Sequence, residues 1–123
     1  MKSLIFIAFT MLSSICFSQT IDIPDRNFER ALIQEGIDTD KTLNGQVLVQ
    51  DVQSVSFLDL YNKKIKCLKG IEAFTSLTYL DCRNNYISDL DLTKNISLHT
   101  LYADVNDVSK NNLEINSANW FGN

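Results

Sequence analysis

The residues best suited to proton transfer are one histidine and two aspartates in the C-terminal half of the chain. His99 is the only histidine, and Asp81 and Asp104 would approach it if their segments lie side by side. General acid–base catalysis also needs a nucleophile or a substrate pocket within reach of the base. No serine or cysteine nucleophile occupies a matching position, so the sequence predicts no enzyme and no cofactor.

A second set of oxygen-bearing side chains has the spacing of a calcium loop. Gly45 can serve as the turn glycine of an EF-hand-like loop. Its ligand positions one, five and twelve are then Asp40, Asn44 and Asp51. Asp51 is shorter than the bidentate glutamate usual at the last position, and Thr42 is a weak ligand at the third. We expect an acidic, hydrogen-bonded loop without metal and keep calcium binding as an alternative.

The N-terminus has the pattern of a secretory signal peptide. Lys2 is followed by an apolar run over residues 4–12 and by small or weakly polar residues, which predicts cleavage after Ser18. Cys16 could instead be the lipidated first residue of a lipoprotein, although Ile15 stands where a small residue is needed. No later segment approaches the roughly 20 apolar residues of a membrane span. We therefore expect a secreted or cell-surface protein without a transmembrane segment.

Charge and cysteine content limit the partners further. Beyond residue 18 the chain has ten basic and fifteen acidic side chains, a net charge of −5, which argues against a nucleic-acid partner. The one basic cluster is expected to be a solvated flank, with contact to an anionic partner as the alternative. It comprises Lys63, Lys64, Lys66 and Lys69. Cys67 and Cys82 are too few for a disulfide framework, and we expect both to be unpaired.

The positions of these side chains are set by a repeat that occurs three times. The segments begin at Val55, Leu77 and Leu98, which are 22 and then 21 residues apart. They follow the pattern L-x-x-L-x-L-x-x-N-x-L, which is typical of leucine-rich repeats. Their apolar positions are Val55, Leu58, Leu60, Ile65 and Leu68; Leu77, Leu80, Cys82, Ile87 and Leu90; and Leu98, Leu101, Ala103 and Val108.

Alternation along a strand decides which of these side chains point inward. Leu58 and Leu60 face the core while Asp59 and Tyr61 face outward, and the same holds in the next two repeats. The asparagine position then turns the chain by bonding nearby backbone groups. Asn85 and Asn106 occupy it, but Lys63 stands there in the first repeat.

The first repeat is expected to be covered by a helix. Pro24 and Asp25 open a helical pattern that ends at Gly36, and Phe28 and Leu32 should pack on the first repeat. A short apolar alternation at Val47 and Val49 predicts an edge strand or turn. After residue 110 the repeat pattern degrades, and Leu113, Ile115 and Trp120 are expected to cover the open end.

These segments resemble bacterial secreted leucine-rich-repeat proteins of the internalin-like kind. The resemblance rests on residues 23–33, 36–40 and 44–48, which are similar to the N-terminal cap, and on residues 70–82, which are similar to the linked repeats. Ser117 to Trp120 is similar to the segment that follows their last repeat. The resemblance implies a recognition module for protein or glycan and implies no catalytic residues.

The sequence therefore predicts a short α/β leucine-rich-repeat solenoid with parallel strands on its concave face and a helical N-terminal cap. We expect a signal peptide (1–18), a cap (19–54), three repeats (55–110) and a C-terminal tail or cap (111–123). The function predicted is extracellular binding of protein, as a monomer, through the concave face. The alternatives are a structural or vestigial fragment and a calcium-dependent adhesin. The candidate contact residues are Phe57, Asp59, Tyr61, Tyr79, Asp81, Arg83, His99 and Tyr102.

Overall fold

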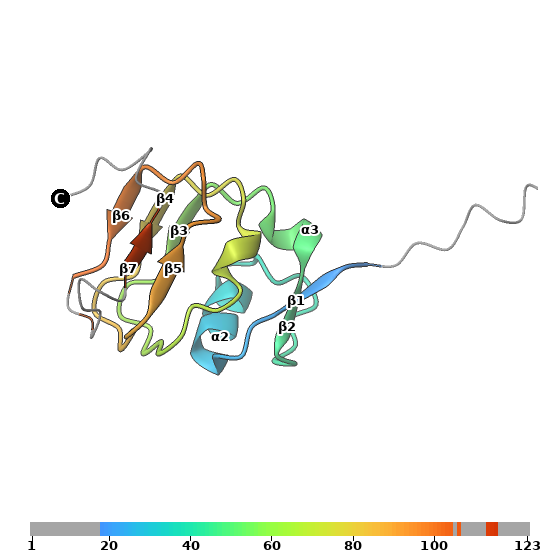
Figure 1. Cartoon of the computed structure of the whole chain (residues 1–123). Helices are drawn as coiled ribbons and strands as arrows, with labels where there is room; N and C mark the ends of the chain where they lie inside the picture. Colours follow the sequence, from blue (N-terminus) through green and yellow to red (C-terminus); the bar gives the residue numbers. More distant parts are fainter. Residues whose placement is uncertain (1–17, 105, 107–112, 116–123) are drawn as a thin grey trace, which may run out of the picture.

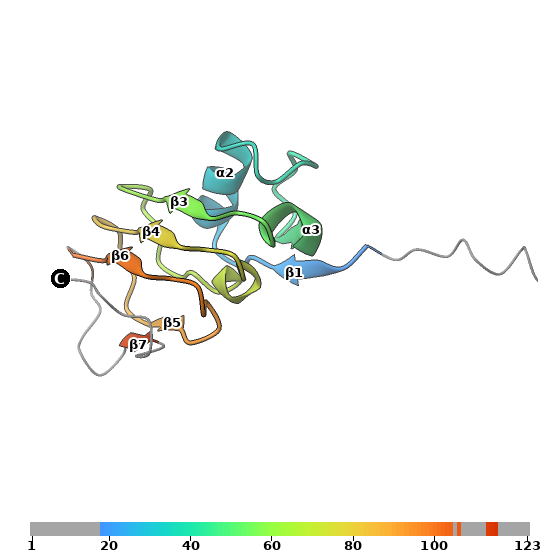
Figure 2. The same cartoon turned by 90° about the horizontal axis from the view of Figure 1, so that it is seen from above.

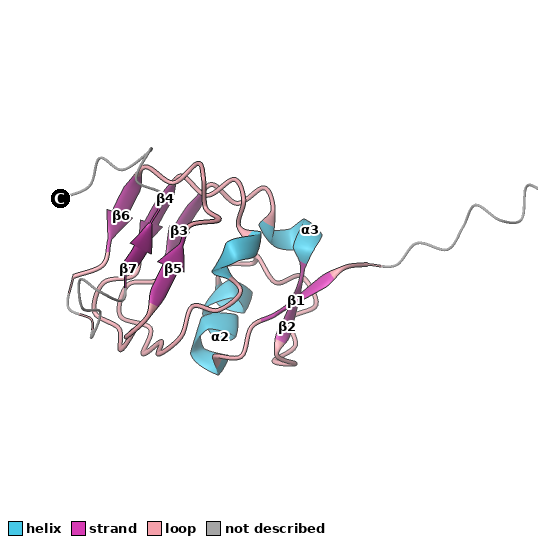
Figure 3. Cartoon of the chain, in the orientation of Figure 1, coloured by secondary structure: helices cyan, strands magenta, loops and turns pink. Residues whose placement is uncertain are grey.

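The computed structural model describes residues 18–104, 106 and 113–115, and shows short strands with few helices (Figures 1 and 3). Residues 1–17 of the predicted signal peptide, Cys16 among them, and Val108 and Trp120 lie outside these residues. In chain order the elements are β1 (Thr20–Asp22), α2 (Arg26–Gln34), β2 (Gln46–Leu48), α3 (Val49–Val52), β3 (Phe57–Asp59), the 3-10 helix η2 (Ile71–Ala73), β4 (Tyr79–Asp81), β5 (Leu90–Leu92), β6 (Thr100–Tyr102) and β7 (Leu113–Ile115). Within the described residues, no helix is long and apolar enough to cross a membrane.

Helix α2 forms where the capping residues predict it. Asp25 is its N-cap, and the Oδ1 atom accepts hydrogen bonds from the backbone N–H groups of Asn27 and Phe28 at 2.9 and 3.1 Å. Gly36, at a φ of 73°, follows the helix in the left-handed conformation that commonly ends helices. The buried Phe28 ring lies 6.2 Å from the ring of Phe74, so α2 packs on the first repeat as expected.

The segment after α2 differs in part from the expected edge strand. Val47 lies in β2, which pairs antiparallel with β1, a strand that the sequence analysis missed. Val49 instead begins the single helical turn α3, so of the expected edge strand or turn only the strand alternative was wrong at Val49. The helical turn places Val52 in the core, which a continued strand through Val49 would not do.

The repeats stack their strands into a parallel sheet of order β3–β4–β6 (Figure 1). Leu58, Leu80 and Leu101 are register partners and point into the core. A second parallel pair, β5 and β7, forms an opposite layer that is separate from the sheet when viewed from above (Figure 2). Apolar side chains from both layers form one core.

Asparagine side chains provide hydrogen-bond partners for the backbone groups of the turns between these layers. The side-chain N–H₂ of Asn85 donates to the carbonyl groups of Leu60, Cys82 and Arg83, and its Oδ1 accepts from Lys63 N and Ile65 N at 3.0 Å. Each asparagine thus serves its own turn and that of the preceding repeat. This explains how the first repeat forms its turn with a lysine at the asparagine position.

A third asparagine also holds the repeats together. The side chain of Asn95 is 1% exposed and donates to the carbonyl groups of Ile71 and Phe74 at 2.8 and 3.1 Å. In the sequence Asn95-Ile96-Ser97, which has the pattern of a glycosylation acceptor, the acceptor side chain of Asn95 is therefore buried in the folded chain.

Candidate functional site

The outward side chains of β3, β4 and β6 form one surface, which we call the strand face. Register places Phe57, Tyr79 and Thr100 in one row and Asp59, Asp81 and Tyr102 in the next. Hydrogen bonds from Asn62 N to Arg83 O and from Asn84 N to Asp104 O extend the pairing by a further row. Tyr61, Arg83 and Asp104 occupy that row.

Aromatic rings cross the strand face diagonally. The rings of Phe57 and Tyr79 stack at 4.4 Å with an interplanar angle of 12°, and Tyr79 meets Tyr102 at 5.8 Å in a tilted arrangement. Stacking alone would be an adequate structural role for Phe57 and Tyr79. However, Phe57 remains 60% exposed, so one ring surface is still open to a partner.

The centre of the strand face is an ion pair enclosed by rings. Arg83 donates from Nε to Asp81 Oδ1 at 3.0 Å and from Nη2 to Asp81 Oδ2 at 2.6 Å. Its guanidinium carbon lies 5.6 Å from the Tyr61 ring centroid and 4.9 Å from that of Tyr102. Such cation–π contacts and bidentate bonds fix the arginine and both rings in one arrangement.

Asp81 differs from the expectation that it is displayed to a partner. It is only 4% exposed, because Arg83 covers it and the neighbouring side chains surround it. The hydrogen bonds from Arg83 lower the pKa of the Asp81 carboxyl group. Burial, and next the charge of Asp81, raise the pKa of Tyr79. Asp81 therefore holds Arg83 in place from below, and Arg83 is the member of the pair that is accessible to a partner.

The remaining predicted residues lie at the edges of the strand face. Asp59 is exposed and accepts a hydrogen bond at 2.9 Å from the Tyr61 backbone N–H. His99 is exposed, and its Nδ1 lies 2.9 Å from the hydroxyl oxygen of Thr100. Asp81 bonds to Arg83, and His99 bonds to Thr100. The candidate histidine–aspartate pair for proton transfer is therefore not formed by these two residues.

The possible calcium ligands are used within their own loop. The Asp40 carboxylate accepts from Thr42 N at 2.7 Å and from the Asn44 side chain at 3.0 Å. Asp51 Oδ2 accepts from the backbone and hydroxyl groups of Thr39. Over the described part of the chain, no group of three or more His, Cys, Asp or Glu residues is placed to hold a metal ion.

Two acidic side chains of this region were missed by sequence reasoning. The buried Glu29 carboxylate accepts the backbone N–H groups of Asn44 and Gly45 at 2.9 to 3.1 Å, which fixes the loop to α2. Asp38 is buried, and desolvation together with the charge of Asp40 raises its pKa to about 6. In the sequence, the only sign that Glu29 is buried was its position beside Phe28, on the side of the helix that packs on the repeats.

A separate half-open cavity of about 420 Å³ lies on the other flank of the repeats. Its apolar floor includes Leu68, Ile71 and Leu90, and charges of both signs surround it. The charged or thiol-bearing residues are Cys67, Lys69, Glu72, Asp89, Asp91 and Lys94. Cys67 is exposed and Cys82 is buried, and both are unpaired thiols.

The stacked strands match those of known leucine-rich-repeat proteins. Residues 53–95 match the family described as leucine-rich repeats in two copies. The functional domain of InlJ from Listeria monocytogenes is similar in structure, with a TM-score of 0.65 and 28% identity over 79% of this chain. The internalin InlF from Listeria monocytogenes gives a TM-score of 0.63 and 25% identity over 72%. The chain carries leucine-rich repeats and is internalin-like in its fold.

A third similar structure extends the likeness beyond Listeria. The structure of the CBM51-2 and INT domains of Clostridium perfringens ZmpB matches with a TM-score of 0.56 and 28% identity over 78% of this chain. The internalin-like chain spans only 22%, 26% and 20% of the InlJ, InlF and ZmpB structures. A comparison with curated protein sequences gives no match.

The InlJ structure is described as including a cysteine ladder. In this internalin-like chain Cys82 occupies the inward position after β4, and burial raises the pKa of its thiol to about 12. Leu60 and Ala103 stand at the equivalent positions of the flanking repeats. Cys82 is thus a small core residue and not a reactive thiolate.

Proposed function

We propose that this protein is an extracellular recognition module that binds a protein partner through the strand face. The observation that carries the proposal is the ordered aromatic cluster around Arg83. Exposed tyrosine, phenylalanine and arginine side chains are enriched at the energetic centres of protein interfaces. Here Asp81 and the ring contacts restrict Arg83 before any partner arrives, which lowers the entropy cost of binding.

The N-terminal segment has a supporting role in this proposal. Phe28 and Leu32 of helix α2 are fully buried, and the Phe28 ring lies 6.2 Å from the ring of Phe74 in the first repeat. A repeat stack needs an end cover to keep its core out of water. The segment is therefore proposed to be the helical N-terminal cap, and the proposed signal peptide would deliver the capped repeats outside the cytoplasm.

The proposal is tested by screening the purified protein against an array of purified extracellular protein domains. The variants Phe57→Ala and Tyr79→Ala are then measured against each domain that binds. We expect each variant to weaken binding by about 30-fold, which corresponds to the roughly 2 kcal/mol loss of a central interface residue.

Tyr86→Ala is the matched control, because Tyr86 is also an exposed ring but lies outside β3, β4 and β6. Its affinity should equal that of the unmodified protein. Equal binding by Phe57→Ala, Tyr79→Ala and Tyr86→Ala would contradict a role for the strand face. A comparison of thermal melts shows whether the two strand-face variants remain folded.

A further inference from the structure

A second surface differs chemically from the strand face, because it is formed by basic side chains of α2 and of the first repeat's turn. We call it the basic patch. Six of the eleven lysine and arginine residues of the chain belong to it, although the chain carries a net charge of −4. They are Arg26, Arg30, Lys63, Lys64, Lys66 and Lys69.

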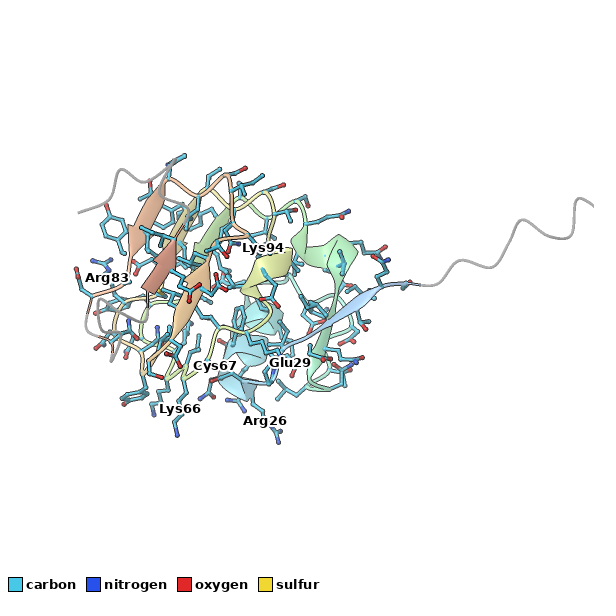
Figure 4. The ribbon with its side chains drawn as sticks, viewed as in Figure 1. Arg26, Glu29, Lys66, Cys67, Arg83 and Lys94 are labelled. Carbon is cyan, nitrogen blue, oxygen red and sulfur yellow. The ribbon has the colours of Figure 1, made fainter. Side chains whose placement is uncertain are left out.

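The two segments of the patch are held together by hydrogen bonds that span about 40 residues of sequence. The Asn27 side chain donates to the carbonyl oxygen of Lys64 at 2.9 Å. Asp25 Oδ2 accepts the backbone N–H groups of Lys66 and Cys67 at 2.8 and 3.1 Å. The N-terminal turn of α2 is therefore fixed against the lysine-rich turn. Arg26 and Lys66 project from the same edge of the molecule in Figure 4.

None of the six basic side chains of the patch forms an ion pair within the described part of the chain. The one ion pair found there joins Arg83 to Asp81 on the strand face. The carboxylates of Asp25 and Glu29 bond to backbone N–H groups, and neither forms an ion pair with a basic side chain of the patch in the described residues. Arg30 donates to the neutral side chain of Asn27 at 2.7 Å.

The placement of the arginines is unfavourable for the helix itself. Arg26 is the first residue of α2, near the positive end of the helix dipole and in the same turn as Glu29, while Arg30 is the middle residue and the last turn contains no basic residue. Helix stability favours the opposite distribution of charge. For Arg26, such a departure from a local rule is consistent with a functional role.

We propose that the basic patch binds an acidic polysaccharide that bears sulfate, carboxylate or phosphate groups. The six cations on two adjoining segments match a repeating anionic chain better than a single small anion. The exposed large apolar side chains of the described residues are Leu43, Phe57, Tyr61, Tyr86, Ile96 and Tyr102. A membrane is the less suitable polyanion, because none of them belongs to residues 26–30 or 63–69, although Tyr61 and Tyr86 border the lysine-rich turn.

The experiment measures binding of the purified protein to immobilised heparin, with neutral dextran as the negative surface. We expect retention at about 50 mM NaCl and release at about 0.2 M, because the attraction is screened by salt. The double variant Arg26→Gln with Lys66→Gln should bind about 25-fold more weakly, at roughly fivefold for each cation removed next to a charged surface.

Lys41→Asn with Lys94→Gln is the matched control, since it removes the same charge from exposed residues outside the two segments. Asparagine suits Lys41, whose φ is 58°. The control should bind heparin within about twofold of the unmodified protein. No retention on heparin, an equal loss in both double variants, or stronger binding to phosphatidylglycerol vesicles than to heparin would overturn the proposal.

Discussion

At the scale of single residues, the strand face depends on one carboxylate that a partner would barely touch. Asp81 is buried, and its two hydrogen-bonded contacts with Arg83 hold the guanidinium between Tyr61 and Tyr102. A buried charge of this kind is tolerated because it is paired and hydrogen-bonded. Sequence alternation identified both residues as outward-facing. It could not show that one covers the other, because this depends on the conformation of a long side chain.

Asp38 makes the stability of the protein depend on pH. Its pKa is raised from 3.8 to about 6, chiefly by burial and next by the charge of Asp40. The folded protein therefore binds this proton more tightly than the unfolded chain does. From Asp38, the free energy of unfolding should rise as the pH falls from 7 through 6 and level off below about 4.

Asp38→Asn removes this dependence, because the amide stays neutral. We expect the variant to be more stable than the unmodified protein at pH 7 by about 2 kcal/mol and no more stable at pH 4, in urea unfolding at both values. Asp91→Asn is a control of opposite sign, since hydrogen bonds from Thr93 lower the pKa of Asp91. A lower stability of Asp38→Asn at pH 7 would show that the carboxylate is favourable there.

At the scale of elements, the contact between the N-terminal segment and the repeats is close at Gly70. This residue has a φ of 106° and precedes η2. A Cβ atom there would lie 2.8 Å from the carbonyl oxygen of Asp22 and would collide with the Ile23 side chain. The end of β1 and the first repeat can therefore meet only around a glycine.

Gly70→Ala should lower the free energy of unfolding by about 3 kcal/mol, because strained backbone and overpacking act together. Gly36→Ala is the matched control. Gly36 also has positive φ, at 73°, but nothing lies within 4 Å of its Cβ position. We expect it to cost about 1 kcal/mol. Equal losses in thermal or urea unfolding would mean that the contact with Ile23 does not constrain the fold.

The elements that the sequence predicted are those with a strong local pattern. Period-two alternation identified the buried Leu58 and Leu80, and the Asp25 cap with its apolar spacing identified α2. β1 was missed because its three residues become a strand only by pairing with β2. The basic patch was seen only as its lysine half, because the hydrogen bond from Asn27 to Lys64 that adds the arginines is a tertiary contact.

At the scale of the whole molecule, the structure places two different surfaces on one small stack of repeats. The strand face combines rings with an enclosed ion pair, and the basic patch joins α2 to the turn after β3. A common core from both sheet layers links them. The two proposals are independent, since the patch variants leave Phe57 and Tyr79 unchanged and can be measured against the same protein partner.

The central claim is that the strand face is the surface that meets a protein partner. Hydrogen–deuterium exchange of the protein, alone and with a binding domain from the screen, tests it most directly. We expect slower exchange in residues 56–62, 78–84 and 99–104 of the complex, while residues 63–69 remain unchanged. Protection confined to residues 63–69 or to the flank around Cys67 and Lys94 would contradict the claim.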